Sequence, residues 1–246
     1  MAHHFFLSYK VEANKPVVLE EENAHHAINV LRLREGEKIT VADSEGKGYV
    51  AEIKSITKKQ LLAEVISTLP NPEPPIKVVL YQGWPKGDKM DLIVEKCTEL
   101  GIDSVVVVST ERSIPRPNPK SINRRRERWQ QKALAAARQS RRHHIPIVKG
   151  PMNLSTALAG INPNCLLIVP WEKESSQSLK TILHNQNKPL EIGILVGPEG
   201  GLTTEEVELA RSYGGKVVTL GPRILRTETA GIACLSAIMY SWGDLG

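Results

Sequence analysis

The sequence predicts an α/β fold in which a large domain built on a parallel β-sheet follows a small β-barrel. From residue 76 onward, short apolar runs rich in β-branched residues alternate with segments of helical periodicity, which is typical of parallel strands joined by helices. The first ~70 residues instead contain short strand candidates separated by tight turns. Leu69–Pro75 has four prolines in seven residues, which favours a stiff linker. We therefore expect one domain at residues 1–72 and a second at residues 73–246.

The small N-terminal domain is predicted from three strand candidates and one helix. The strand candidates are Lys38–Ala42, Gly48–Ile53 and Gln60–Ile66, and the helix is expected around Ala24–Leu33. Asp43–Gly46 joins the first two strands and contains the Asp, Ser and Gly residues that tight turns prefer. Short strands connected in this way indicate a small β-barrel.

The large domain is predicted from apolar runs without strict alternation, as in strands that are buried on both faces. These runs are Ile76–Tyr81, Ser104–Ser109, Cys165–Val169, Ile192–Val196 and Lys216–Leu220. Between the first two runs, Asp88–Leu100 repeats apolar residues every three or four positions, and Gly101 is placed to end the resulting helix.

Two further helices are expected towards the C-terminus. Thr203 and Glu206 have the spacing of a capping box, and Gly214 is placed to end the helix that they begin. Thr227–Ser241 is small and apolar on most sides, so this helix should pack on the sheet or against another subunit.

The composition is that of an ordinary globular protein with a mildly basic balance. The chain has 246 residues, a net charge of +5 and 41% hydrophobic residues, which is compatible with an anionic partner. Its three cysteines show neither metal-ligand nor disulfide spacing and lie in apolar runs, so buried free thiols are expected. The first residues lack the features of a secretory signal, and no run approaches the ~18 apolar residues of a membrane helix. We expect a cytoplasmic protein without membrane association.

The segments Leu195–Leu202 and Leu220–Ala230 contain most of the residues suited to chemistry. Each follows a predicted strand and leads into a predicted helix, so the two can meet at the carboxyl edge of a parallel sheet, where ligands bind. Gly197–Gly201 can offer bare backbone amides to a flat ligand, or it is simply a glycine turn between strand and helix. Arg226–Thr229 is dense in polar groups, although Thr227 can equally cap the helix beside a solvated arginine.

Together, the two segments resemble the C-terminal signature of the SPOUT class of RNA methyltransferases, and most closely the family that methylates N3 of one uridine in bacterial 16S ribosomal RNA. The resemblance extends over most of the chain to His26–Arg34, Lys86–Gly101, Glu111–Ser113 and Gln139–Arg141. It implies a SPOUT parallel-sheet domain with a trefoil knot and a PUA-like N-terminal domain. It also implies S-adenosylmethionine (SAM) as cofactor without a metal, 16S rRNA or the small ribosomal subunit as partner, and a homodimer formed through the SPOUT domain.

The resemblance also implies roles for individual residues. The cofactor-binding residues would be Pro170, Leu195, Val196, Gly197, Glu199, Gly200, Leu220, Gly221, Ile224, Leu225, Thr229 and Ala230. Uracil N3 must lose its proton, and the negative charge that spreads to O2 and O4 needs stabilisation, a role expected for Arg226. Glu228 is the expected proton acceptor, provided that it points into the site.

The expected RNA contacts come from the N-terminal motif and from a basic run between residues 121 and 144, where positive charges suit phosphates. They are His26, Arg32, Arg34, Lys86, Arg112, Arg124, Arg125, Arg138, Arg141 and Arg142. The alternatives are a solvated amphipathic helix for the run, simple packing for His26, and contact with a partner subunit's site for Arg112.

The chain departs from the family pattern at two places. Arg138 stands where the family has an acidic residue, which makes that surface more basic. His3 and His4 stand where the family has a basic residue before Phe5 and Phe6, so contacts from this arm are an open question.

The sequence thus predicts SAM-dependent methylation of uridine N3 in 16S rRNA. Two alternatives stay open: a SPOUT methyltransferase acting on another RNA, and a non-catalytic RNA-binding protein of ribosome assembly that kept the fold.

Overall fold

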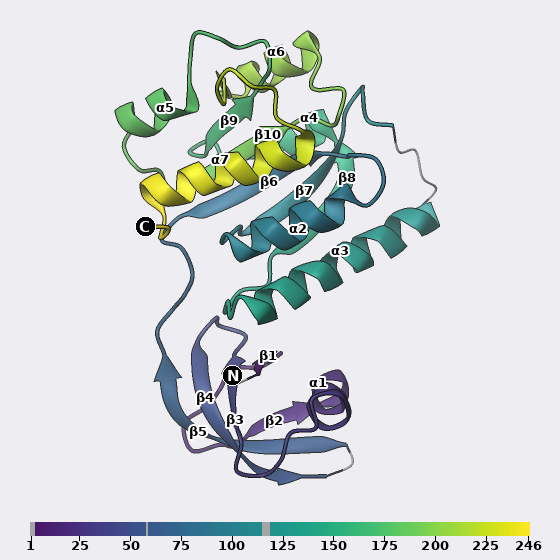
Figure 1. Cartoon of the computed structure of the whole chain (residues 1–246), viewed down its shortest axis with the longest axis vertical. Helices are drawn as coiled ribbons and strands as arrows, with labels where there is room; N and C mark the ends of the chain where they lie inside the picture. The colour runs from purple at the N-terminus through teal and green to yellow at the C-terminus, as the bar shows by residue number, and fades with distance from the viewer. Residues whose placement is uncertain (1–2, 58, 115–118) are drawn as a thin grey trace. The chain divides into compact units, whose positions relative to one another are not determined.

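The computed structural model of the chain describes residues 3–57, 59–114 and 119–246. The chain divides into two compact units, of which the first comprises residues 1–73 and 137–144 and the second residues 74–136 and 145–246. Figure 1 labels most of the helices and strands of both units.

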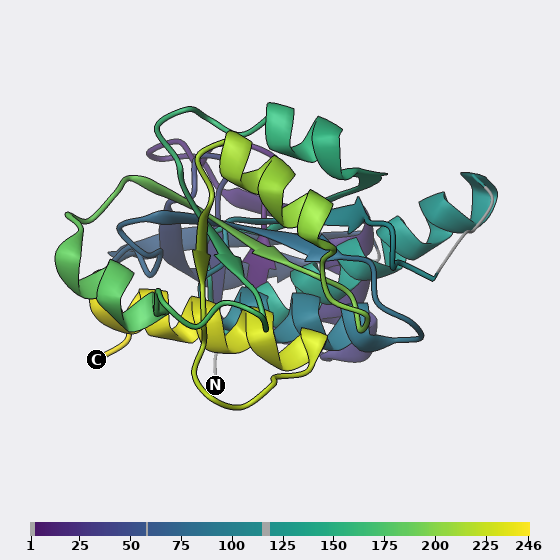
Figure 2. The same ribbon diagram turned by 90° about the horizontal axis from the view of Figure 1, so that it is seen from above.

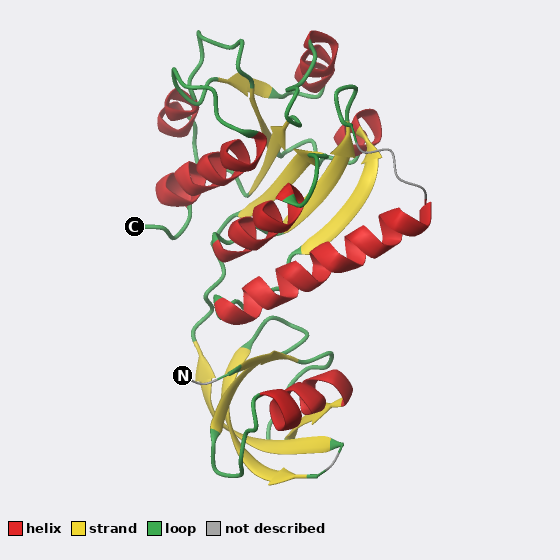
Figure 3. Ribbon diagram, turned by 45° about the vertical axis from the view of Figure 1, so that its right-hand side comes forward, coloured by secondary structure: helices red, strands yellow, loops and turns green. Residues whose placement is uncertain are grey.

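The first unit is a five-stranded sheet in the order β1-β3-β4-β5-β2. Its strands are β1 (His4–Phe6), β2 (Val17–Glu20), β3 (Lys38–Ala42), β4 (Gly48–Ile56) and β5 (Gln60–Leu69). β1 runs parallel to β3, and the other pairs are antiparallel. Figure 3 shows the strands curving around an interior, which Phe5, Leu19 and Ile39 help to fill.

The helical segment of this unit differs from the single helix expected at Ala24–Leu33. A short α-helix, α1 (Glu21–His25), passes directly into a π-helical turn, η1 (His26–Val30). The helix cannot continue to Leu33 because Arg32 has a positive φ of 56°, outside the helical region.

The second unit is a six-stranded sheet in the order β11-β9-β10-β6-β7-β8, with all neighbours parallel. The strands are β6 (Lys77–Gly83), β7 (Ser104–Ser109), β8 (Ile147–Asn153), β9 (Leu166–Pro170), β10 (Glu191–Val196) and β11 (Lys216–Val218). The predicted α/β class with a parallel sheet is therefore confirmed.

Helices cover both faces of this sheet, as Figure 2 shows from above. They are α2 (Lys89–Glu99), α3 (Pro119–Gln139), α4 (Leu154–Ala159), α5 (Leu179–Asn185), α6 (Thr204–Ser212) and α7 (Thr227–Trp242). Apolar residues of α2, α3, α5 and α7 pack in one core, and those of α4 and α6 pack in the other. α6 begins with the predicted capping box, because the Thr203 hydroxyl and the Glu206 carboxylate each accept a hydrogen bond from the other's backbone N–H.

Three elements of this unit were not predicted. β8 is an edge strand whose apolar pattern is interrupted by Gly150 and Pro151, and proline is tolerated in a sheet mainly at such an edge. α4 and α5 have only 6 and 7 residues, too few for helical periodicity to be recognised.

The cysteines follow the prediction in two cases out of three. Cys97 and Cys234 are buried free thiols, and burial raises the pKa of each to about 12. Cys165 is also free but only partly buried, which corrects the expectation for this residue. Among the described residues, no helix combines the length and the apolar character that crossing a bilayer requires.

Candidate active site

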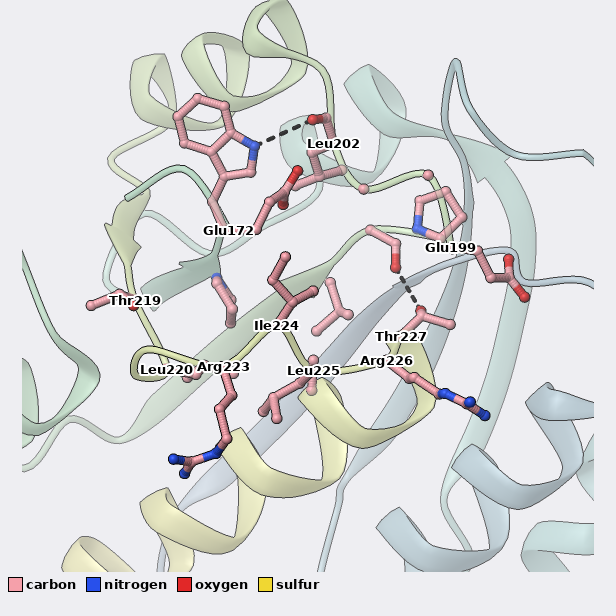
Figure 4. Close-up of a pocket in the computed structure, with 18 of the residues that line it drawn as sticks. Glu172, Glu199, Leu202, Thr219, Leu220, Arg223, Ile224, Leu225, Arg226 and Thr227 are labelled. Carbon is pink, nitrogen blue, oxygen red and sulfur yellow. Dashed lines mark hydrogen bonds between the residues drawn. The ribbon is translucent and has the colours of Figure 1, made fainter. Parts of the chain in front are cut away.

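A cavity of about 550 Å³ opens at the carboxyl edge of the second sheet, lined by the loops that follow β9, β10 and β11. These three strands are neighbours in the sheet and run parallel, so their loops meet at one edge. Figure 4 shows the loops surrounding the cavity. The two signature segments are therefore brought together as the sequence predicted.

Most of the predicted cofactor-binding residues line this cavity. They are Pro170, Val196, Gly197, Glu199, Gly200, Leu220, Gly221, Ile224, Leu225 and Ala230. Leu195 and Thr229 are not among the lining residues. Leu195 is completely buried in the core beside α4 and α6, because successive residues of a strand face opposite sides of the sheet, and Thr229 is exposed on α7.

Glycine is required in the β10 loop because the backbone folds tightly on itself there. A Cβ atom at Gly197 would lie 2.8 Å from the backbone nitrogen of Leu202, closer than real Cβ atoms come. In the β11 loop, Gly221 has a φ of 114°, which side chains disfavour. The conformation of the two loops therefore itself requires glycine at Gly197 and Gly221.

A buried polar network fixes the β10 loop to the start of α7. The Gln82 side chain, at the end of β6, donates through Nε2 to the Thr227 hydroxyl at 2.9 Å and to the Gly83 carbonyl at 3.0 Å. Thr227 Oγ1 in turn donates to the Gly197 carbonyl at 2.6 Å, a hydrogen bond drawn in Figure 4. Since buried hydrogen bonds are costly to leave unmade, this network holds two sides of the cavity together.

A charged cluster lies at one side of the cavity. Lys89 Nζ, at the first residue of α2, is 2.8 Å from Glu199 Oε1 and 3.3 Å from Glu228 Oε2. Burial raises the pKa of Glu199, but hydrogen bonds from Lys89 and from the Lys86 backbone N–H outweigh it and leave this pKa below its usual value. The hydrogen bond with Glu199 raises the pKa of Lys89, so the pair is ionised at neutral pH.

The two expected catalytic residues are placed differently. Arg226 lines the cavity, and in Figure 4 its guanidinium extends towards the side on which Glu199 lies. Glu228 does not line the cavity and instead faces Lys89. The condition attached to its role, that it points into the site, is therefore not met in this structure, because its carboxylate is paired with Lys89.

Trp171 and Glu172 line the cavity beside Pro170, in the loop after β9 that the family resemblance implies as the third loop of the pocket. Trp171 forms part of the wall and donates from Nε1 to the Leu202 carbonyl at 3.3 Å, and Glu172 lies beside Gly201. Their position directly after a predicted strand was the available signal. Lys89 lies in the Lys86–Gly101 segment of the family resemblance, but only the sheet order places the end of β6 next to β10 and so brings Lys89 to the cavity.

Several expected RNA-binding residues of the second unit are engaged in contacts. Arg112 Nη1 donates to the Gly200 carbonyl at 2.7 Å, so Arg112 supports the β10 loop of its own chain. Arg125 lies over the ring of the buried Trp84 at 5.9 Å. Arg124 and Lys86 have exposed side chains.

In the first unit, the structure contradicts the predicted RNA contact of Arg142. Its side chain is 5% exposed, and its guanidinium binds the carboxylate of Glu73, which also accepts the backbone N–H groups of His143 and His144. A guanidinium held in this way is not available to RNA phosphates. The proline-rich linker is accordingly anchored at Glu73.

The other expected RNA contacts of this unit are more accessible. Arg32, Arg34 and Arg141 are exposed. Arg138 is half-buried and donates from Nη2 to Asn23 Oδ1 at 2.9 Å, and His26 is half-buried with its ring edge-on to Phe5. His4 is buried, and burial together with the neighbouring His143 lowers its pKa to about 4, so it is neutral at pH 7.

Comparison with known proteins identifies the family. Residues 72–239 match the model of an RNA methyltransferase domain, and residues 19–66 match that of an RNA methyltransferase PUA domain. The chain is 38% identical to ribosomal RNA small subunit methyltransferase E of Bacillus subtilis over 89% of this chain and 88% of that one. The chain belongs to the ribosomal RNA small subunit methyltransferase E family. The resemblance proposed from the sequence is thereby confirmed.

Two solved structures share the fold over the whole chain. The methyltransferase E of Neisseria gonorrhoeae, bound to S-adenosylmethionine, is 31% identical with a TM-score of 0.89 and full coverage of both chains. A methyltransferase of Legionella pneumophila in complex with the same cofactor is 28% identical with a TM-score of 0.87, again over both full chains.

Proposed function

We propose that this chain transfers the methyl group of SAM to N3 of a specific uridine in the 16S rRNA of the small ribosomal subunit. The observation that carries the proposal is the cavity, formed by three loops at one sheet edge, in a chain of this methyltransferase family. The names of the relatives support ribosomal RNA as the substrate class, and two structural neighbours hold SAM.

The residues around the cavity suit SAM. The β10 loop comes close with bare backbone at Gly197 and Gly200, which lets peptide groups approach a flat adenine. Leu220, Leu225 and Trp171 supply apolar walls. SAM, when bound, supplies a methyl group made electrophilic by its sulfonium, without help from a metal. Among the residues that the structure describes, no group of three or more His, Cys, Asp and Glu side chains is arranged to hold a metal ion.

The chain's own task is to make uracil N3 a nucleophile. The base must be unstacked and placed with N3 next to the cavity, and the charge that spreads to O2 and O4 must be stabilised. The exposed guanidinium of Arg226 is proposed for this stabilisation. Glu228 stays the proposed proton acceptor, which requires its side chain to rotate from Lys89 towards the cavity.

Substrate binding is proposed to involve both predicted domains, residues 1–72 and 73–246. Exposed Arg32, Arg34 and Arg141 of the first unit and Arg124 of the second are candidates for phosphate contacts. A homodimer through α7, where Tyr240 is 76% exposed, is proposed as the functional assembly. The trefoil knot and the cytoplasmic location stay predictions.

The test is labelled methyl transfer from SAM to three acceptors: small subunits lacking the modification, naked 16S rRNA and bulk transfer RNA. The methylated nucleoside is then identified by mass spectrometry. We expect N3-methyluridine in 16S rRNA. Transfer to another RNA or another atom would replace the proposed target, and the absence of SAM binding would favour a non-catalytic RNA-binding protein.

A further inference from the structure

Lys89 lines the cavity and carries a positive charge, and the reaction proposed above gives it no role. It begins α2, which is joined by residues 84–88 to β6, the strand that neighbours β10, and its side chain is 34% exposed. Its two carboxylate partners come from distant parts of the sequence, Glu199 from the β10 loop and Glu228 from the first turn of α7. The fold therefore assembles this cluster from three elements at the edge of the cavity.

The hydrogen-bonding capacity of Lys89 exceeds these two contacts. An ammonium group has three N–H donors. Glu199 Oε1 lies 2.8 Å from Nζ, whereas Glu228 Oε2, at 3.3 Å, pairs with it by charge and has no hydrogen-bond partner among the described residues. Lys89 also lines the cavity, so an N–H that its two carboxylate partners do not take can reach an acceptor bound at the cavity. Uracil offers two such acceptors, the carbonyl oxygens O2 and O4, which flank N3.

A second lysine of the same helix shows what an ordinary surface cluster looks like. Lys96 also lies between two carboxylates, Glu95 and Glu99, each at 2.9 Å. All three residues belong to α2, and the Lys96 side chain is 40% exposed. Exposed pairs of this kind contribute little to stability. Lys96 thus matches Lys89 in residue type, helix and number of carboxylate partners, but it does not line the cavity.

We propose that Lys89 is a catalytic residue, whose Nζ donates a hydrogen bond to a carbonyl oxygen of the target uracil and stabilises the negative charge that develops there. The proposal rests on the proposed function. As the N3–H bond breaks, the proton passes to a carboxylate or to water, and the electron pair spreads towards O2 and O4. The N3 pair then forms the bond to the methyl carbon while the carbon–sulfur bond breaks and its electrons stay on sulfur. Lys89 and Arg226 supply two positive charges to this anion.

The carboxylate partners keep the ammonium in place before RNA arrives. Glu199 is itself fixed by the Lys86 backbone N–H at 3.1 Å, so Lys89 is held by an anchored group. Preorganised donors of this kind stabilise a transition state without having to reorient during the reaction.

The experiment compares Lys89→Gln with Lys96→Gln in single-turnover methyl transfer at saturating SAM and RNA. We expect the rate of Lys89→Gln to fall about 100-fold, as for loss of one preorganised donor. Lys96→Gln should match the wild type. Calorimetric SAM affinity should stay within about threefold in both variants, because the proposed contact is made to the base and not to the cofactor.

Two further readouts separate charge stabilisation from a structural role. With Lys89 present, uracil ionises more easily, so the rate profile of Lys89→Gln should move to higher pH. Placing 5-fluorouridine at the target, whose N3 proton is more acidic, should reduce the defect of Lys89→Gln.

The outcomes are distinct from those that test the function. If the wild type produces N3-methyluridine and Lys89→Gln keeps a rate within threefold of Lys96→Gln, the role of Lys89 is overturned while the function stands. A large loss with an unchanged pH profile and an equal defect on 5-fluorouridine also overturns it, since Lys89 would then only hold Glu199. An inactive wild type with every acceptor removes both proposals.

Discussion

Arg142 and Arg226 are two arginines for which the sequence predicts contact with the RNA substrate, and they meet opposite environments in the structure. Arg142 is buried in the first unit against the carboxylate of Glu73. Arg226 is exposed at the cavity of the second unit, just before α7. The sequence distance between Arg142 and Glu73 is 69 residues, which no local pattern reveals. The comparison teaches that an arginine is free to contact a substrate only where the fold does not bring a carboxylate to it.

Arg142→Met should give the largest effect, a loss of about 3–5 kcal/mol in the free energy of unfolding, because the largely enclosed carboxylate of Glu73 would lose its only charged partner among the described residues. Urea unfolding measures this change. The neighbouring, exposed Arg141→Met should change stability by less than about 0.5 kcal/mol. If Arg142→Met instead weakens RNA binding at normal stability, the two arginines are not different in kind and the comparison fails.

Arg226→Ala should reduce the rate of methyl transfer by about 10²–10³-fold while the fold and the RNA affinity are retained. The reason is that Arg226 is expected to act on charge that exists only during the reaction. Single-turnover rates measure the loss. Arg223→Ala, whose guanidinium extends to the other side of the cavity in Figure 4, should lose less. Near-normal turnover of Arg226→Ala would remove Arg226 from the reaction.

Acid should destabilise the first unit through His4, which is stacked on His143 at 6.0 Å in the same region as Arg142. Burial first, and the charge of His143 second, lower the pKa of His4 from 6.5 to about 4. The unfolded chain therefore gains a proton below pH 6.5 before the folded chain does, and stability falls as the pH drops from 6.5 to about 4. The total loss is at most about 3 kcal/mol.

The His4 effect is checked by thermal unfolding at the two ends of this pH range. His4→Gln should flatten the pH dependence, whereas substitution of the exposed His3 should leave it unchanged. An equally steep decline in His4→Gln would assign the acid sensitivity to other groups, such as Glu73.

Thr227→Val should have the smallest effect, because it removes hydrogen bonds and keeps the shape. The Gln82 amide and the Gly197 carbonyl lose their shared partner, at a cost of about 1–3 kcal/mol. We expect this cost to loosen the β10 loop and to weaken SAM binding about tenfold in calorimetry, equivalent to about 1.4 kcal/mol. Thr156→Val, at an exposed position of α4, is the control, and equal SAM affinities would show that the network does not shape the cavity.

Most of the cavity lining could be predicted from the sequence, and the reason is physical. Gly197, Gly200 and Gly221 lie in loops that directly follow recognisable strands, so their placement at one sheet edge follows from local pattern and parallel topology. Leu195 was misplaced because a strand alternates its side chains between two faces, and the sequence of a doubly buried strand does not say which face is which.

The sequence by itself determined the features that depend on residues close together along the chain. These are the apolar runs that form strands, the Thr203–Glu206 capping box, and the glycines where a turn or close approach excludes side chains. Tertiary structure alone decided the pairings across the fold. The sheet order places β6 beside β10, and only then does Lys89 reach Glu199 and Glu228. The energy of an ion pair depends on the distance between the two charges in space, whereas a sequence pattern shows only their separation along the chain. The order of the strands in the sheet determines which distant residues come close together.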